Sequence, residues 1–147
     1  LTGRYYEPVM CYKCEDAETI IVMMGSLAEV AEAAVDEMRA KGEKVGLMRM
    51  KLWRPFPTED VRKALEKAKL VVVCDRSITL GGNCGPVCSE IRAALWPLAK
   101  RPEVLSFIVG LGGRDVQPSG ITGIVHQAQA DAKAGVVKDF TVWGVRG

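Results

Sequence analysis

The chain has 147 residues, 48% of them hydrophobic and 26% charged, which fits a single globular domain with a sizeable core. Its 20 basic and 18 acidic residues leave a net charge of +2, and without a long Lys or Arg run the sequence gives no electrostatic basis for binding nucleic acid. No apolar stretch approaches the ~18–20 residues of a membrane-spanning helix, so we expect neither nucleic acid nor a membrane among its partners.

The first regular elements follow a lead-in segment, residues 1–18, which carries no strong pattern. Thr19–Met24 is a short apolar run rich in β-branched residues and is predicted to be a strand. Ser26 and Glu29 have the spacing of a capping box and predict the start of a helix that ends near Gly42. Apolar residues recur along this helix at helical spacing and predict its buried face: Leu27, Val30, Ala31, Ala34, Val35 and Met38.

A second strand, a second helix and a third strand follow in the middle of the chain. Lys44–Leu52 is the strand candidate, and the prolines of Trp53–Pro57 end it because proline breaks the hydrogen-bond ladder. Thr58 is expected to cap a helix over Glu59–Lys69. Leu70–Asp75 is then predicted to be a strand that is apolar on both faces, as in a parallel sheet covered by helices.

The last third of the chain continues the alternation of helix and strand. Pro86 is well placed in the first turn of a third helix, Val104–Val109 is the next strand, and Pro118–Ala134 is predicted to be a fourth helix. Residues 135–147 form a tail in which Thr141–Val145 is a candidate edge strand. The whole β-α repetition predicts one three-layer α/β/α domain over residues 19–134, with a mostly parallel sheet and right-handed crossovers.

The most pointed junction is LSFIVGLGGRD, Leu105–Asp115, in which a strand runs directly into paired glycines. Because glycine tolerates positive φ, this turn exposes Arg114 and Asp115 at the carboxyl edge of the sheet, where open α/β folds bind ligands. Gly25-Ser26 and Gly112-Gly113-Arg114 are therefore candidates for binding phosphate or coenzyme A. Neither matches the G-x-G-x-x-G fingerprint, and tight turns without a ligand are the favoured alternative.

The five cysteines include two close pairs. Cys11 and Cys14, together with Cys84 and Cys88, could supply four thiolates to zinc or an iron–sulfur cluster. Against a metal, the second pair flanks Pro86 at a helix start and the first pair precedes the first predicted strand. A metal site, a disulfide or redox pair, and free thiols all stay open, with free thiols favoured.

Cysteine usage also bears on the compartment. An odd number of cysteines, with Cys74 inside an apolar run, favours a reducing environment, and we expect a cytoplasmic protein. The amino terminus, LTGRYYEP, lacks the pattern of a secretory signal. It also lacks an initiator Met, which leads us to expect a fragment or a processed product.

The Trp53-Arg54-Pro55-Phe56-Pro57 loop is a candidate interaction surface, because proline orders it in advance and its aromatic and Arg side chains are typical interface anchors. Its alternative is a rigid crossover whose rings pack on the domain's own sheet. We take Trp53, Arg54 and Phe56, with Arg114 and Asp115, as interface candidates.

Catalytic constellations are scarce. The one histidine, His126, lies in the fourth predicted helix, where a surface role is favoured over that of a general base. No Ser-His-acid set and no G-x-S-x-G elbow can be assembled, so no catalytic residue is assigned.

Six short segments in order carry a resemblance to a known family: Glu15-Asp16-Ala17-Glu18, Met24-Gly25-Ser26, Gly42-Glu43-Lys44-Val45-Gly46, Arg54-Pro55-Phe56-Pro57, Asp75-Arg76 and Gly110–Asp115. Together they resemble the transketolase C-terminal-like domain in the α part of 2-oxoacid:ferredoxin oxidoreductases of the pyruvate:ferredoxin oxidoreductase type. The resemblance covers the chain from Thr2-Gly3-Arg4 to about Ile124. The four paired cysteines depart from the family's pattern, so they cannot be assigned as cluster ligands by analogy.

The resemblance implies an enzyme that oxidatively decarboxylates a 2-oxoacid, with pyruvate expected, and that transfers the acyl group to coenzyme A. Its cofactors would be thiamine diphosphate, Mg²⁺ and iron–sulfur clusters, all held by other domains, and its electrons would pass to ferredoxin. The chain itself would be a supporting module that binds no cofactor alone, assembles with the other domains or subunits and forms part of an oligomer. A stand-alone nucleotide- or coenzyme A-binding protein and a cysteine-ligated metal domain are the alternatives.

Overall fold

The centre of the fold is a six-stranded sheet with the strand order β1-β3-β2-β4-β5-β6. The computed structural model describes residue 3 and residues 6–144, so Thr2, Arg4 and Val145 lie outside the described residues. The strands are β1 (Val9–Tyr12), β2 (Thr19–Met24), β3 (Val45–Met50), β4 (Leu70–Asp75), β5 (Glu103–Ile108) and β6 (Thr141–Val142). β1 runs antiparallel to β3, and the other neighbouring strands are parallel. The predicted mostly parallel sheet is confirmed.

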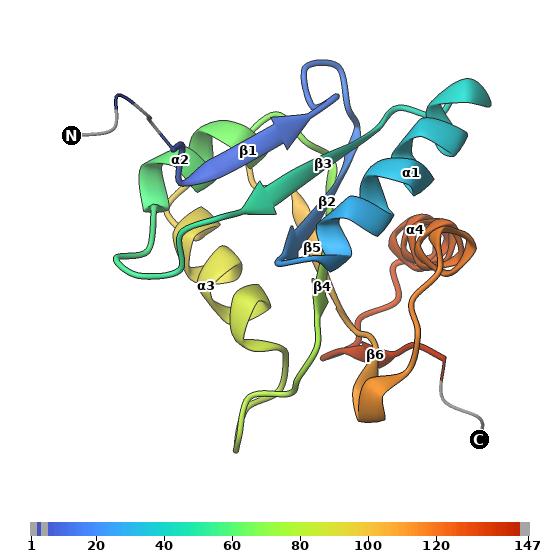
Figure 1. Ribbon diagram of the computed structural model, residues 1–147. Helices are drawn as coiled ribbons and strands as arrows, with labels where there is room; N and C mark the ends of the chain where they lie inside the picture. The colour runs from blue at the N-terminus through green and yellow to red at the C-terminus, as the bar shows by residue number, and fades with distance from the viewer. Residues whose placement is uncertain (1–2, 4–5, 145–147) are drawn as a thin grey trace.

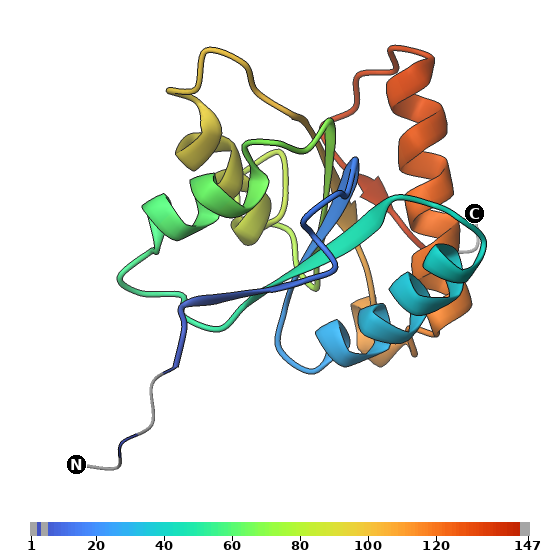
Figure 2. The same ribbon diagram turned by 90° about the horizontal axis from the view of Figure 1, so that it is seen from above.

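Four helices cover the two faces of this sheet. They are α1 (Leu27–Ala40), α2 (Thr58–Leu65), α3 (Pro86–Leu95) and α4 (Pro118–Lys133). Helices α1 and α4 lie on one face and α2 and α3 on the other, as Figure 2 shows from above. Every residue of β4 is buried, because this central strand is covered from both sides. The three-layer α/β/α prediction is confirmed.

The first helix begins directly after Ser26, as predicted, but the side-chain caps predicted for the first two helices do not form. Ser26 already has helical backbone angles (φ −66°, ψ −27°) and its side chain makes no capping hydrogen bond, so the capping box with Glu29 does not form. A capping residue needs extended backbone angles to turn its oxygen toward the free N–H groups. Thr58 is likewise the first residue of α2 rather than its cap, and α2 ends at Leu65, earlier than predicted.

Sequence patterns missed strand β1 within the lead-in segment. This strand is four residues long, lies at the sheet edge and is only partly buried, so it lacks the apolar run that marks the inner strands. It pairs with β3 from Val9 opposite Met50 to Tyr12 opposite Leu47. The last strand, β6, is confirmed at Thr141–Val142 beside β5.

The strand order creates a switch point between β2 and β4. The chain leaves β2 through α1 on one face of the sheet and leaves β4 through α3 on the other. In open α/β sheets a crevice opens where two neighbouring strands diverge in this way, beyond their carboxyl ends. The segment between β4 and α3 also projects far from this edge (Figure 1, yellow-green).

Candidate functional site

The carboxyl edge of the sheet collects the glycine junctions that the sequence singled out. Gly25 follows β2 with φ of +78°, and Gly110, Gly112 and Gly113 follow β5 with φ between +66° and +77°. These values lie in the left-handed region that favours glycine, so the chain can leave each strand by a sharp turn. Arg114 and Asp115 are exposed at this edge, as predicted.

Asp75 is the buried polar residue at this edge. Its carboxylate accepts hydrogen bonds from the backbone N–H of Val87 (2.9 Å) and of Cys88 (3.1 Å), in the first turn of α3. It therefore caps α3 from the end of the neighbouring strand β4. Burial raises the pKa of Asp75, and the two backbone hydrogen bonds act in the opposite direction.

Gly85 makes this cap sterically feasible. A Cβ atom at Gly85 would lie only 2.1 Å from the Asp75 Oδ2 atom, far inside van der Waals contact. The residue has ordinary extended angles (φ −69°, ψ 155°), so space rather than backbone conformation requires glycine here.

A cavity of about 280 Å³ opens beside Asp75 at the switch point. Its walls come from the ends of β2 and β4, the start of α3 and the loop after β3: Met24, Leu27, Trp53, Cys74, Asp75, Arg76, Ser77, Pro86 and Val87. Sequence reasoning named Trp53 in this set but missed the cavity. The strand-end dipeptide Asp75-Arg76 was the available signal, because switch-point crevices are built from residues that follow strand ends.

The Trp53–Pro57 loop packs on its own domain and also presents a charge to solvent. The Trp53 and Phe56 rings meet edge to face at 5.8 Å, and both pack against the core beneath α2 and α3. The Arg54 guanidinium lies 4.4 Å from the Trp53 ring centre and 2.5 Å from a Glu90 carboxylate oxygen on α3. The rings therefore follow the rigid-crossover alternative, while their role in an interface stays a prediction.

The structure places the two candidate anion-binding turns in separate hollows. Gly25 and Ser26 border one hollow with Arg49 and Lys51, whereas Arg114 lines another with Trp143. Gly112 and Gly113 belong to a short 3-10 turn, Leu111–Gly113, in front of Arg114. The Arg114 guanidinium donates to the Gly144 carbonyl oxygen and so is already engaged with the chain itself.

The four paired cysteines do not converge. Cys84 and Cys88 are buried at the start of α3, near the carboxyl edge, whereas Cys14 contacts Gly46 near the amino end of β3. Among the described residues no three or more His, Cys, Asp or Glu side chains come together in a way that could hold a metal ion. The arrangement does not fit an iron–sulfur cluster, which requires four ligands around one point.

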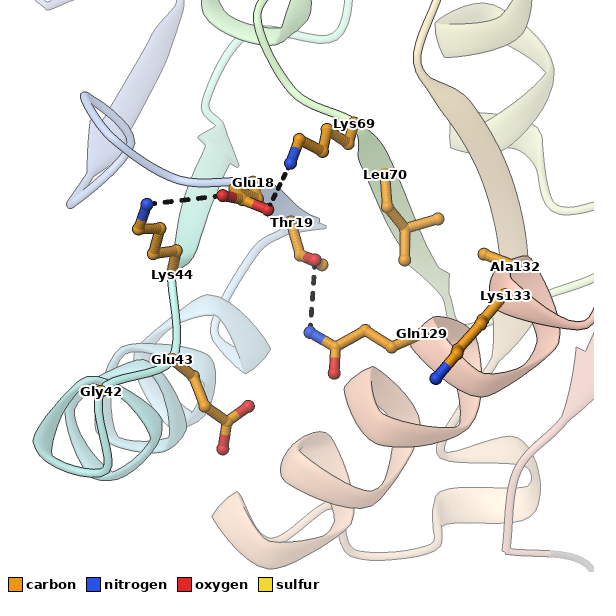
Figure 3. Close-up of a pocket in the computed structure, with 10 residues that line it drawn as sticks. All are labelled: Glu18, Thr19, Gly42, Glu43, Lys44, Lys69, Leu70, Gln129, Ala132 and Lys133. Atoms are coloured by element: carbon orange, nitrogen blue, oxygen red, sulfur yellow. Dashed lines mark hydrogen bonds and ion pairs between the residues drawn. The ribbon is translucent and has the colours of Figure 1, made fainter.

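The opposite, amino edge of the sheet carries a broad open groove of about 750 Å³ between the ends of α1 and α4 (Figure 3). Several of its polar side chains are paired: Glu18 binds Lys69 (2.7 Å) and Lys44 (3.4 Å), and the Gln129 amide donates to the Thr19 hydroxyl (3.3 Å). His126 lies nearby on α4, half exposed, with its Nε2 atom 3.1 Å from both Glu43 carboxylate oxygens.

Large apolar side chains are exposed at the carboxyl edge. Met24 is the last residue of β2, Leu52 follows β3, and Ile78 and Leu80 lie in the projecting segment after β4. Leu80 is 100% exposed. Within residue 3 and residues 6–144, no helix combines the length and the apolar character that crossing a membrane requires.

A family model and individual relatives both place this chain in one protein family. Residues 17–121 match the family described as pyruvate:ferredoxin oxidoreductase core domain II. Pyruvate synthase subunit PorA of Methanothermobacter thermautotrophicus is 43% identical over 127 residues, which are 86% of this chain and 32% of the relative. The α subunit of NADH-dependent phenylglyoxylate dehydrogenase from Aromatoleum evansii is 36% identical over 96% of this chain and 34% of its own length. The chain thus spans about a third of the length of these relatives.

Solved structures agree with the fold. The 2-oxoglutarate:ferredoxin oxidoreductase from Magnetococcus marinus, solved with 2-oxoglutarate, coenzyme A and succinyl-CoA bound, matches with a TM-score of 0.64 and 26% identity over 84% of this chain and 20% of that one. A split-gene transketolase in an inactive β4 tetramer matches with a TM-score of 0.64 at 17% identity over 87% of this chain and 44% of that one, a likeness of fold alone. The transketolase-like fold that the sequence predicted is confirmed. The chain belongs to the pyruvate:ferredoxin oxidoreductase core domain II family.

Proposed function

We propose that this chain is a structural and assembly domain of a thiamine-diphosphate-dependent 2-oxoacid:ferredoxin oxidoreductase in the cytoplasm. The complete enzyme would convert a 2-oxoacid to acyl-CoA and reduce ferredoxin. Other domains or subunits would hold thiamine diphosphate with Mg²⁺ and the iron–sulfur clusters. This chain would supply the surface on which those parts assemble.

The relatives support the reaction class more strongly than a particular substrate. Their names refer to pyruvate, phenylglyoxylate and 2-oxoglutarate, which are three different 2-oxoacids. A domain shared among enzymes of such different substrates is expected to perform a task that is common to them. We therefore propose the 2-oxoacid class, with pyruvate as the first substrate to test.

The observation that carries the assembly role is the exposed apolar surface at the carboxyl edge: Met24, Leu52, Ile78 and Leu80. Exposed apolar side chains that gather on one edge are typical of a surface that another protein part covers. Leu80 is fully exposed, so its side chain contributes no hydrophobic stabilisation to this chain alone. Burying it against another protein part would release the free energy of transferring its apolar surface from water.

The projecting segment is also ordered in advance. Thr79 N–H donates to the Cys84 carbonyl (3.0 Å), and Gly82 N–H donates to the Thr79 carbonyl (2.9 Å). The Asn83 amide donates to Asp139 in the segment before β6 (3.3 Å). A segment held by its own hydrogen bonds loses less conformational entropy on docking, which favours its use as a contact.

The substitution Leu80→Asp tests this role. We expect it to weaken association with the remaining subunits of the oxidoreductase by at least about tenfold, because burying one Leu is worth about 1.5–3 kcal/mol. Val137→Asp is the matched control, since Val137 is 95% exposed between α4 and β6. Association is measured by calorimetry, with thermal melting of each variant alone as the folding check.

Activity of the assembled enzyme gives the second readout. Pyruvate-dependent reduction of ferredoxin should fall with Leu80→Asp in proportion to lost assembly and stay unchanged with Val137→Asp. Equal association of both variants and the parent chain would refute the assembly surface.

A further inference from the structure

The switch-point cavity is continuous with the exposed apolar surface of the carboxyl edge. Met24 belongs to both, because it lines the cavity and is 45% exposed. Arg76 and Ser77 are exposed residues of the cavity wall, and the chain runs from them directly into Ile78 and Leu80 of the projecting segment. The cavity therefore opens within the surface that we propose for assembly.

The interior of the cavity is mostly apolar. Leu27 comes from the start of α1, Cys74 from the end of β4 and Val87 from the first turn of α3, while Trp53 comes from the loop after β3. The volume of about 280 Å³ lies just below the range of about 300–1,000 Å³ that is usual for small-molecule sites. A cavity of this size and lining suits one protruding apolar side chain better than a large cofactor.

Contacts within the chain hold the cavity walls in place. The Trp53 ring meets the Phe56 ring edge to face at 5.8 Å and lies 4.4 Å from the Arg54 guanidinium. On the opposite wall, the Asp75 carboxylate accepts the N–H of Val87 and so fixes the start of α3. A pocket that is formed before a partner arrives costs less conformational entropy on binding.

The surroundings of the cavity are basic. Among the residues that the structure describes, neither Arg76 nor Lys51, which borders the adjacent hollow, forms an ion pair. The Asp75 carboxylate is turned toward the N–H groups of α3, and Glu29 of the adjacent hollow binds Arg49 at 3.7 Å. Cations without a partner on the chain itself are complemented by carboxylates of another protein part.

We propose that the switch-point cavity is the anchor pocket of the assembly surface. It receives one large apolar side chain next to an Asp or Glu, both from another subunit or domain of the oxidoreductase. The apolar side chain lies among Leu27, Trp53 and Val87, and its acidic neighbour pairs with Arg76. Binding free energy concentrates at such sites, where one side chain fills a desolvated pocket. The inference rests on the proposed assembly role and names the chemistry of its partner.

Charge substitutions at Arg76 test the acidic neighbour. We expect Arg76→Glu to weaken association with the remaining subunits at least about tenfold at low salt, and Arg76→Gln to weaken it less, because only the first adds repulsion. Calorimetry at about 50 mM and about 500 mM salt should show the difference from the parent chain shrinking as salt screens the pair. Lys100→Glu is the matched control, since Lys100 is exposed in the loop between α3 and β5 and should have no effect.

A matched pair of substitutions on α1 tests the apolar anchor. Leu27 and Val30 are both half-buried and pack against the same core, but only Leu27 lines the cavity. Leu27→Ala should weaken association at least about fivefold, as truncation at an anchor site does, whereas Val30→Ala should leave it unchanged. Thermal melting of each variant alone verifies that both are folded.

The outcomes separate the anchor pocket from the assembly role. If Leu80→Asp weakens association while the Arg76 and Leu27 variants bind like the parent chain, the assembly surface stands and the anchor pocket is overturned. If none of these variants weakens association, both are overturned. Stronger association of Arg76→Glu, or an effect that salt does not reduce, overturns the acidic partner.

Discussion

At the scale of single residues, the contact between Asp75 and Gly85 holds the start of helix α3 against the end of strand β4. The carboxylate fills the space that a side chain at Gly85 would need, and it satisfies two N–H groups that would otherwise lack partners within the helix. This small arrangement fixes the direction in which α3 leaves the carboxyl edge, and it forms one wall of the switch-point cavity.

Gly85→Ala should lower the free energy of unfolding by about 1–3 kcal/mol, because the added methyl group displaces the Asp75 carboxylate from a packed site. Gly120→Ala is the control. Gly120 lies in the first turn of α4, and a Cβ atom there would be an ordinary 3.6 Å from Trp143. Urea unfolding should show the control unchanged or more stable by up to about 1 kcal/mol. Equal stability of the two variants would show that the space beside Asp75 does not require glycine at position 85.

At the scale of elements, the sequence predicted the inner strands and the helices because each has a long apolar signal. β2 and β4 were predicted with their observed bounds, since both are almost wholly buried and end in recognisable turns. β1 escaped notice because an edge strand needs only a partner and little burial. The capping contacts were predicted incorrectly because the backbone angles of Ser26 and the distant carboxylate of Asp75 depend on tertiary packing, which short sequence spacing does not encode.

The candidate site was predictable to a smaller extent. Glycine turns at strand ends correctly indicated the carboxyl edge, since positive φ is a local property of the residue. Which turns share a hollow depends on strand order, and strand order is set by packing across the sheet.

Arg39 joins α1 to the turn after β1 and to β3. Its loss should weaken the packing of α1 against these two strands. Arg39→Lys keeps the charge but cannot reach the Lys13 carbonyl, the Val45 carbonyl and Asp16 together. We expect the free energy of unfolding to fall by about 1–2 kcal/mol. Hydrogen exchange should become faster in β1 and stay unchanged in β5; unaltered exchange in β1 would contradict this role.

At the scale of the whole molecule, carboxylates in ion pairs should set the response to acid. Basic partners, and for two of them a Tyr hydroxyl or a Gln amide as well, lower the pKa values of Asp16, Glu18, Asp36 and Asp131. Their stabilising contributions are present above the unfolded-state pKa values and are lost as the pH falls through the lower folded-state values. Asp75 acts in the opposite sense, because its raised pKa gives a contribution that is lost as the pH rises through the folded-state value.

The melting temperature should therefore fall as the pH is lowered below about 4, where these four carboxylates take up protons. Asp36→Asn should make this loss shallower, because it removes one titrating partner of Lys13 and Tyr12. Calorimetric melting across this range measures both slopes. A melting temperature that is independent of pH there would contradict the assignment.

The proposed assembly role depends on which edge of the molecule meets the rest of the enzyme. Hydrogen exchange of this chain alone and in the assembled oxidoreductase compares the two edges in a single measurement. We predict that assembly slows exchange in the segment around Leu52 and in the projecting segment around Ile78 and Leu80, and leaves the amino-edge groove around Lys44 unchanged. Slowed exchange confined to the amino edge, with the projecting segment exchanging as in the isolated chain, would contradict the account.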